Sequence, residues 1–460
     1  MKIKSELSDI SELGGGYLNR SLVIVLLFII ISTGVIIRIN NLTSSFFYDE
    51  AVYADMAHHP LKSQFYSDVI FFRHPPLWHI LLMGMGMVFG YSEIAFRIPS
   101  ILFSCATILL CYFLGKEYKS EWIGIVAATL LTFNVIHQQY SQAATMYSAL
   151  CFFTTLAFYG LKKNDGRITF LGIILAMYTN YFGLLLLLAL GIQKWMLNSY
   201  RIIQTIREVK WYIIAYVPWI PIAIWGGLYH LTRGAVESPS YPSYFQISNL
   251  IVHSSIPLFL GFTYYAYKNR KDVSEWMAFI TIGLFVMTSL IICPFHRYIL
   301  FILPITTVLG VLGIHEFMKL YRIKSINRYV IMFILLIGFF LPNPECYGIY
   351  PYSDEYLDER DMIHKQQWHE VIDIIDYGII MTYNRPSMRY YLDIREKTNN
   401  SVIQYSSLKS LKEKIEGNSI RWVIISKQYP DIMEYMSNKS EFIEYKVLDH
   451  IILYKNIIND

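Results

Sequence analysis

Charged residues are scarce in this chain of 460 residues, in which Asp, Glu, Lys and Arg make up 16% and hydrophobic residues 54%. Soluble globular proteins carry about a quarter charged residues. So apolar a composition excludes one large water-soluble core, and the high content of aromatic residues excludes a disordered or fibrous chain. The composition therefore predicts a polytopic membrane protein whose surroundings are the lipid bilayer.

Signals of several other function classes are also missing. The chain has 5 Cys, most of them in apolar runs, and no CxxC spacing, so it predicts neither a disulfide framework nor a zinc site. A net charge of +4 does not indicate a nucleic-acid partner. The sequence has no Gly-rich phosphate loop that would hold a nucleotide, and no internal repeat or low-complexity tract.

Charge is distributed unevenly along the chain. Charges occur in short clusters between apolar runs up to about residue 343, and from residue 345 onward the composition is ordinarily polar. We therefore expect two domains, a membrane domain over 1–343 and a small α/β domain over 344–460. Periodicity in the second part predicts helices at 368–375 and 408–415, buried strands at 378–382 and 421–426, and a strand pair at 442–448 and 451–454.

Apolar runs predict about eleven membrane spans, several of them short. They lie at 21–39, 99–115, 122–135, 148–161, 168–178, 182–197, 211–228, 250–267, 276–293, 299–318 and 330–341. Residues 77–90 form an apolar piece that is too short to span, so we expect an interfacial or re-entrant helix there.

Basic residues orient these spans. With the N-terminus in the cytoplasm, 19 Lys and Arg residues before residue 342 fall on the inner side and 6 on the outer side. This is the positive-inside pattern. It predicts a multi-pass protein of the plasma membrane whose C-terminal domain lies outside the cytoplasm.

The first outer loop, 40–98, holds an unusual density of polar groups. Asp49 and Glu50 stand among aromatic residues, where carboxylates at a membrane surface are costly unless they are paired or used. An acid pair that stabilises the start of a helix is the structural alternative. Arg73 and His74 precede two prolines and carry groups suited to a phosphate, although a snorkelling pair at the headgroups fits them as well.

Two further stretches carry arginines at the outer side. Glu93 and Arg97 are four residues apart, so on a helix they would form a structural ion pair. Arg297 and Tyr298 lie at the outer edge of a late span. This arginine either snorkels to the interface or neutralises a phosphate at the bilayer surface.

These motifs resemble, in their order, those of the GT-C glycosyltransferases that use polyprenyl-phosphate-linked sugars. The relevant relatives are protein O-mannosyltransferases, the lipid A aminoarabinose transferase and lipopolysaccharide-core transferases. The matching pieces are Asp49-Glu50 with Tyr53-Ala54, His74-Pro75-Pro76-Leu77, Phe89-Gly90 with Ser92-Glu93 and Arg97, and Arg297-Tyr298 with Pro304. The resemblance implies a GT-C-like helical membrane body with a C-terminal extracytoplasmic α/β domain.

Two elements depart from the family pattern. A frequent SREARMY reads SQAATMY over Ser141–Tyr147, with Ala143 and Thr145 at positions that are charged in the family pattern. A frequent YTHYF reads YTNYF, with Asn180 in place of His. These changes remove a second acidic group from the expected reaction centre and with it the basis for a metal held by two carboxylates. We expect no required cofactor, with a divalent metal left open.

The resemblance implies transfer of a monosaccharide from a polyprenyl-phosphate donor to a hydroxyl acceptor on a glycan, lipid or protein, with inversion. It assigns proton removal to Asp49, with Glu50 orienting that carboxylate or the acceptor. Arg73, His74, Arg297 and Tyr298 are then the candidates for the donor phosphate. Candidates for sugar or acceptor contacts are Tyr53, Tyr147, Asn180 and Tyr181.

Two other function classes fit parts of the same pattern. Polar outer loops and broken short spans also occur in lipid or sugar transporters and flippases. The ionisable residues of this chain, however, lie mostly at the outer rim rather than at mid-membrane. The loss of charge in SQAATMY is also compatible with a catalytically weakened GT-C scaffold that binds or assembles partners.

Overall fold

The structure is a computed structural model. It describes residues 19–39, 42–46, 48–58, 75–224, 256–289, 296–320, 368–383, 385–395, 397, 399–405, 407–427, 429–448 and 451–457. Contacts divide the chain into two compact units. The first, which we call the helical unit, comprises residues 1–40, 61–81 and 97–349. The second, the sheet unit, comprises residues 41–60, 82–96 and 350–460. The predicted boundary at residue 343 stays a prediction.

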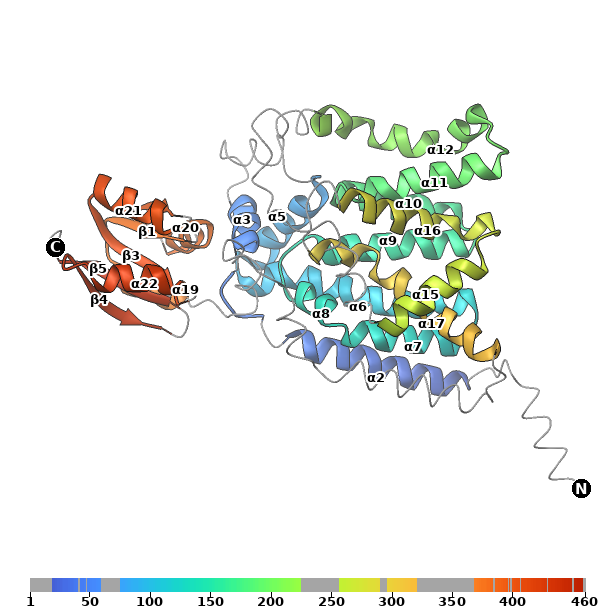
Figure 1. Ribbon diagram of the computed structural model, residues 1–460, viewed down its shortest axis with the longest axis horizontal. Coiled ribbons are helices and arrows are strands. Elements are labelled where there is room, and N and C mark those ends of the chain that lie inside the picture. Colours follow the sequence, from blue (N-terminus) through green and yellow to red (C-terminus); the bar gives the residue numbers. More distant parts are fainter. Residues whose placement is uncertain are drawn as a thin grey trace, which may run out of the picture. The chain divides into compact units, whose positions relative to one another are not determined.

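The helical unit is built from antiparallel helices that follow the predicted apolar runs (Figure 1). Its elements are α2 (Arg20–Ile39), α6 (Glu93–Tyr118), α7 (Glu121–Phe133), α8 (Val135–Ser141), α9 (Tyr147–Lys162), α10 (Gly166–Thr179), α11 (Gly183–Leu197), α12 (Ile202–Tyr216), η2 (Val217–Trp219), α15 (Ile256–Lys268), η3 (Val273–Glu275), α16 (Trp276–Ser289), η4 (His296–Phe301) and α17 (Leu303–Leu320). Helix α5 (Leu77–Phe89) and helix α6 each begin in one unit and continue into the other.

Small residues let these helices approach closely. A side chain at Gly313 of α17 would collide with the backbone of Gly261 on α15, and one at Gly172 of α10 would collide with the backbone of Ala157 on α9. Such backbone contact is a common way to pack helices that have no hydrophobic driving force in lipid. Helices α9, α10, α11 and α12 then pack in succession (Figure 1).

Among the described residues, α2, α6 and α17 are long and apolar enough to cross a membrane. Shorter apolar helices are α5, α7, α10, α11 and the segment Val273–Met287. The predicted break between 178 and 182 separates two helices, α10 and α11. The last predicted span, 330–341, lies outside the described residues, so the count of eleven stays a prediction.

Helix α12 differs clearly from its predicted bounds. Helix α12 runs over Ile202–Tyr216, whereas the apolar run predicts 211–228. It starts after Ser199 and Tyr200, which both have positive φ, and gives way to the 3-10 turn η2 at Pro218. Its first half is amphipathic, so a search for continuous apolar residues misses it.

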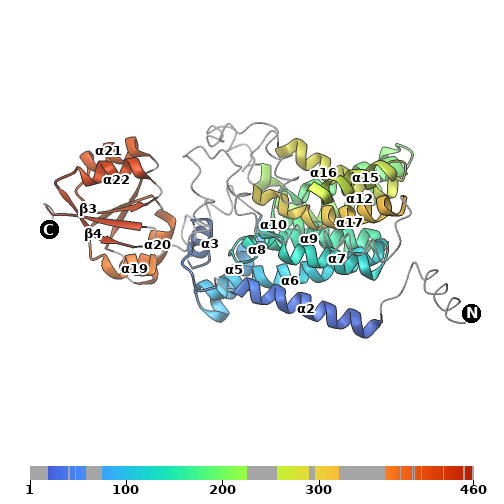
Figure 2. The same cartoon turned by 60° about the horizontal axis from the view of Figure 1, so that its bottom comes forward.

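The sheet unit contains a five-stranded sheet in the order β2-β1-β3-β5-β4. Its strands are β1 (Ile379–Thr382), β2 (Ser401–Gln404), β3 (Ile420–Ser426), β4 (Phe442–Val447) and β5 (Ile451–Asn456). Strands β2, β1 and β3 are parallel, and β5 is antiparallel to both β3 and β4. The helices α19 (Trp368–Ile374), α20 (Arg385–Ile394), α21 (Leu408–Gly417) and α22 (Pro430–Ser437) lie on the two faces of the sheet, as Figure 2 shows.

The central strand β3 explains this layering. All seven of its residues are buried. Val423 and Ile425 pack into a core with Leu411 of α21 and Met436 of α22. A strand that is apolar on both faces needs cover on both faces, so helices complete a three-layer α/β/α arrangement. The predicted strands and the predicted helices of this part are confirmed, whereas β2, α20 and α22 were not predicted.

Candidate active site

Asp49 and Glu50 lie in the first turn of helix α3 (Tyr48–His58), which belongs to the sheet unit. Acidic groups there interact favourably with the positive end of the helix dipole. The Glu50 side chain is only 2% exposed, while Asp49 is half-buried. Tyr53 is also buried, one turn further along the helix. Asp49 therefore keeps access to solvent or a substrate, which a group that accepts a proton needs.

The segment before α3 is fixed by the C-terminal part of the chain. The backbone N–H of Phe46 donates to Tyr391 Oη (2.6 Å), and Ser387 Oγ donates to the carbonyl oxygen of Phe46 (3.1 Å). The Phe46 ring stacks on the Phe96 ring, with 5.9 Å between the ring centres, and meets the Tyr390 ring edge to face, with 5.2 Å between the ring centres. Both polar groups of the Phe46 backbone and its side chain are thus held in place.

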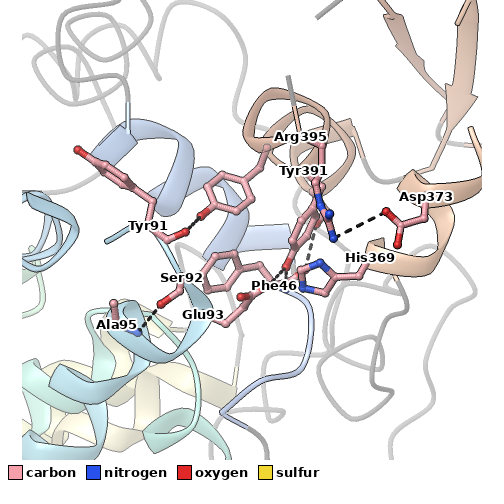
Figure 3. A network of polar contacts seen from close by, with 11 residues as sticks. Phe46, Tyr91, Ser92, Glu93, Ala95, His369, Asp373, Tyr391 and Arg395 are labelled. Atoms are coloured by element: carbon pink, nitrogen blue, oxygen red, sulfur yellow. Dashed lines mark hydrogen bonds and ion pairs between the residues drawn. The ribbon is translucent and has the colours of Figure 1, made fainter. Parts of the chain in front are cut away.

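Glu93, the first residue of α6, takes part in the same network (Figure 3). Its Oε1 accepts a hydrogen bond from Tyr391 Oη at 2.6 Å and lies 2.7 Å from His369 Nε2. The predicted partner was Arg97. The bonds that the structure describes for Glu93 are with Tyr391 and His369, and the pairing with Arg97 stays a prediction. A partly buried carboxylate gains from two donors that packing already holds in place.

Arg297 and Tyr298 lie in η4, in the helical unit. The guanidinium carbon of Arg297 is 5.7 Å from the ring centre of Tyr147 and 5.8 Å from that of Tyr298. The two tyrosine rings meet edge to face, with 6.0 Å between their centres. The Phe182 ring packs on the Tyr298 ring, with 4.7 Å between the ring centres. Aromatic faces attract a guanidinium and hold its plane, so the two tyrosine rings fix the position of the Arg297 head group.

The two motifs that depart from the family pattern are in contact with each other. Asn180 follows the last residue of α10, and its Nδ2 lies 3.5 Å from Met146 Sδ in SQAATMY. Its Oδ1 accepts from the backbone N–H of Phe182 (2.9 Å), which closes the turn into α11. Thr145 is 1% exposed, and its carbonyl oxygen accepts from Ser100 Oγ (3.4 Å). A charged residue at this buried position would need a partner, whereas the neutral hydroxyl of Thr145 costs much less to bury than a charge.

Sequence reasoning missed a polar group at the end of α2. Arg38 is fully buried, and its guanidinium bonds Ser104 Oγ (2.8 Å), the carbonyl oxygen of Thr132 (3.3 Å) and His137 Nδ1 (2.9 Å). It thereby joins α2 to α6, α7 and α8. Polar residues within apolar runs, such as Ser104 and His137, are the signal from which such an internal contact could have been predicted.

The predicted site residues form two groups, one in each unit. Asp49, Glu50 and Tyr53 belong to the sheet unit, with Glu93. Arg297, Tyr298, Tyr147, Asn180 and Tyr181 belong to the helical unit, where the first three form one cluster and Asn180 adjoins it through the turn at Phe182. Arg73 and His74 lie outside the described residues.

Comparisons with known proteins agree on the architecture. The sequence model of the dolichyl-phosphate-mannose-protein mannosyltransferase family matches residues 73–225. The structure is similar to ArnT from Cupriavidus metallidurans in the apo state, with a TM-score of 0.60 and 11% identity over 95% of this chain and 98% of that one. It is similar to the same ArnT bound to undecaprenyl phosphate, with a TM-score of 0.54 and 10% identity over 96% and 99% of the two chains.

A third similar structure is the oligosaccharyltransferase of Archaeoglobus fulgidus in the apo form. Its TM-score is 0.56 and its identity 12%, over 89% of this chain and 70% of that one. No curated protein matches the sequence. The predicted fold class, a polytopic helical membrane body with a C-terminal α/β part, is confirmed by these structures.

Proposed function

We propose that this protein transfers a monosaccharide from a polyprenyl-phosphate donor to a hydroxyl acceptor. The chain has the fold of the GT-C glycosyltransferases and is a multi-pass integral membrane protein. One observation carries the proposal. The ArnT structure that holds undecaprenyl phosphate shares this fold over 96% of the chain. Undecaprenyl phosphate is the lipid that remains when a sugar leaves such a donor, so the shared fold supports the same class of leaving group.

The chemistry of this transfer needs a base and a stabilised leaving group. A hydroxyl attacks the anomeric carbon only as its proton is removed, and we assign that step to Asp49, with Glu50 as the group that orients it. In-line attack displaces the lipid phosphate and inverts the anomeric centre. The half-buried position of Asp49 in the first turn of α3 supports this assignment.

The departing lipid phosphate gains negative charge, which cationic groups stabilise. We assign this role to Arg297 with Tyr298, and to Arg73 with His74. The cluster of Arg297 between two tyrosine rings supports the first pair. Tyr53, Tyr147, Asn180 and Tyr181 are the proposed contacts to sugar or acceptor, although the bonds of Asn180 within its turn also give it a structural task.

We further propose that the N-terminus lies in the cytoplasm and that the C-terminal domain and the acceptor lie outside it. The distribution of basic residues, 19 on one side and 6 on the other, supports this orientation.

We propose that transfer requires no cofactor. Turnover that survives EDTA supports this statement, and turnover lost in EDTA and restored by a divalent cation contradicts it.

Mass spectrometry of lipids that copurify with the protein tests the proposed donor. We expect a polyprenyl-phosphate-linked sugar, and we expect Arg297→Ala to reduce its recovery. Arg270→Ala is the matched control, because it also removes an arginine that lies over a tyrosine ring. The guanidinium carbon of Arg270 is 4.1 Å from the ring centre of Tyr267, and Arg270 is exposed. A transporter would move such a lipid across the bilayer without cleaving it. Intact donor after incubation with acceptor in proteoliposomes therefore contradicts the transferase.

A further inference from the structure

Helix α20 of the sheet unit contacts both ends of helix α3, which carries Asp49. At the first end, Ser387 and Tyr391 bond the carbonyl oxygen and the N–H of Phe46. At the second end, Asp393 Oδ2 lies 3.3 Å from Nδ1 of His58, the last residue of α3. One helix of the C-terminal part therefore contacts both the segment just before α3 and the last residue of α3.

The hydroxyl of Tyr391 is the centre of this contact (Figure 3). It accepts from the Phe46 N–H and donates to Glu93 Oε1, each at 2.6 Å. Burial raises the pKa of the Tyr391 phenol well above its usual value, and the nearby Glu93 carboxylate raises it further. The phenol therefore stays protonated, and one group satisfies a donor and an acceptor from two separate segments of the first outer loop.

Neighbouring residues fix the same segments. Tyr390 Oη donates to the carbonyl oxygen of Tyr91 (3.1 Å), and the Tyr91 ring packs edge to face on His58 at 4.5 Å. His369 of α19 forms a hydrogen bond with the Glu93 carboxylate. Its ring also packs edge to face on the Tyr391 ring, with 4.7 Å between the ring centres. The loop that carries the proposed base is thus held by side chains between 276 and 345 positions away in the sequence.

We propose that Tyr391 is a positioning residue, which holds the start of α3 so that the Asp49 carboxylate lies at the reacting hydroxyl. The inference rests on the proposed function of Asp49. Phe46 precedes Asp49 by less than one helical turn, so a shift of its backbone moves the carboxylate with it. Reaction rates are sensitive to such shifts, since a displacement of about 1 Å can cost on the order of 100-fold in rate.

Tyr391→Phe in the full-length protein tests this proposal, because it keeps the ring and removes only the hydroxyl. We expect faster hydrogen exchange at residues 46–53 and a turnover about 10-fold lower. Turnover is measured as polyprenyl phosphate released from a lipid extract of the producing cells. Binding of undecaprenyl phosphate should stay within about 2-fold, because the proposed phosphate groups are unchanged. Tyr445→Phe on strand β4 is the control, since that ring is exposed and packs on Trp422.

Ser387→Ala is a second variant with the same expected pattern, should Tyr391→Phe fold poorly. Unchanged exchange at residues 46–53 overturns the positioning claim, and so does faster exchange with full turnover per folded molecule. Asp49→Asn separates this claim from the proposed function. If Asp49→Asn keeps full turnover, the assignment of the base is wrong, while the exchange measurement still decides whether Tyr391 holds the start of α3.

Discussion

At the scale of single residues, sequence patterns suggested candidate groups but not the contacts that they make. The DE pair, the RY pair and the YTNYF element were chosen from the sequence, and the structure places Arg297 and Tyr298 in one cluster with Tyr147. The partner of Glu93 could not be predicted, because His369 and Tyr391 belong to no motif and lie far along the chain. Helical spacing favoured a local pair, and only the folded chain shows the tertiary one.

Arg297→Ala should lower turnover on the order of 100-fold, because the lost charge acts more strongly on the departing phosphate than on the bound donor. Arg297→Lys should recover part of the loss, since an ammonium keeps the charge but loses the planar fork that grips two oxygens. Folded yield should stay near that of the wild type. Kinetics of the purified variants check this, with Arg270→Ala as the control. Wild-type turnover in Arg297→Ala would assign the phosphate contact to another group.

At the scale of elements, apolar periodicity predicted most helices of the helical unit and the longest strands of the sheet unit. Several short elements were missed. Helix α20 reads RPSMRYYLDI, in which Tyr390 and Tyr391 are buried beside Met388 and Leu392, and β2 is a strand of four residues with an exposed start. Helix α12 was displaced because its polar face interrupts the apolar run. Such elements owe their structure to tertiary packing rather than to local preference.

Gly313→Ala should destabilise the pair of helices α15 and α17, because the new methyl group meets the backbone of Gly261 and no side chain can move aside. Overpacking of this kind costs about 1–3 kcal/mol. Gly283→Ala in α16 is the matched control, since a Cβ there meets nothing within 4 Å. Thermal unfolding in detergent compares the two variants. Equal melting temperatures would contradict the close approach of these helices.

An ion pair in the sheet unit predicts a dependence on pH. Arg421 and Trp422 donate hydrogen bonds to the Asp376 carboxylate. These bonds, of which those from Arg421 have the larger effect, lower the pKa of Asp376 from 3.8 to about 2. A folded-state pKa below the unfolded value stabilises the fold above about pH 4, and the stabilisation is lost as the pH falls towards about 2. Asp376→Asn should therefore cost about 1 kcal/mol near neutral pH, allowing for solvent screening of this exposed group.

Hydrogen exchange over strand β3 at several pH values measures this effect. The difference between wild type and Asp376→Asn should shrink as the pH falls. Asp373→Asn is the control, because Asp373 and Arg395 form an exposed pair at 3.7 Å that should contribute little. A difference that stays constant down to about pH 2 would show that the charge of Asp376 is not the cause.

At the scale of the whole molecule, composition alone predicted an integral membrane protein, and the fold agrees with that of ArnT and of the archaeal oligosaccharyltransferase. The proposed sidedness follows from basic residues. Single cysteines introduced at the exposed Lys412 of α21 and at Lys271 should therefore react with an impermeant thiol reagent from opposite sides of the membrane. Labelling of both from the same side of intact cells or spheroplasts would refute the orientation.

The central claim is that Asp49 removes a proton during sugar transfer from a lipid phosphate. The most direct measurement follows the release of polyprenyl phosphate from the copurified donor in wild type and in Asp49→Asn. Loss of a general base typically costs on the order of 100-fold or more in turnover. We therefore predict that Asp49→Asn copurifies with as much donor lipid as the wild type but releases almost no phosphate. Wild-type release by well-folded Asp49→Asn would contradict the account.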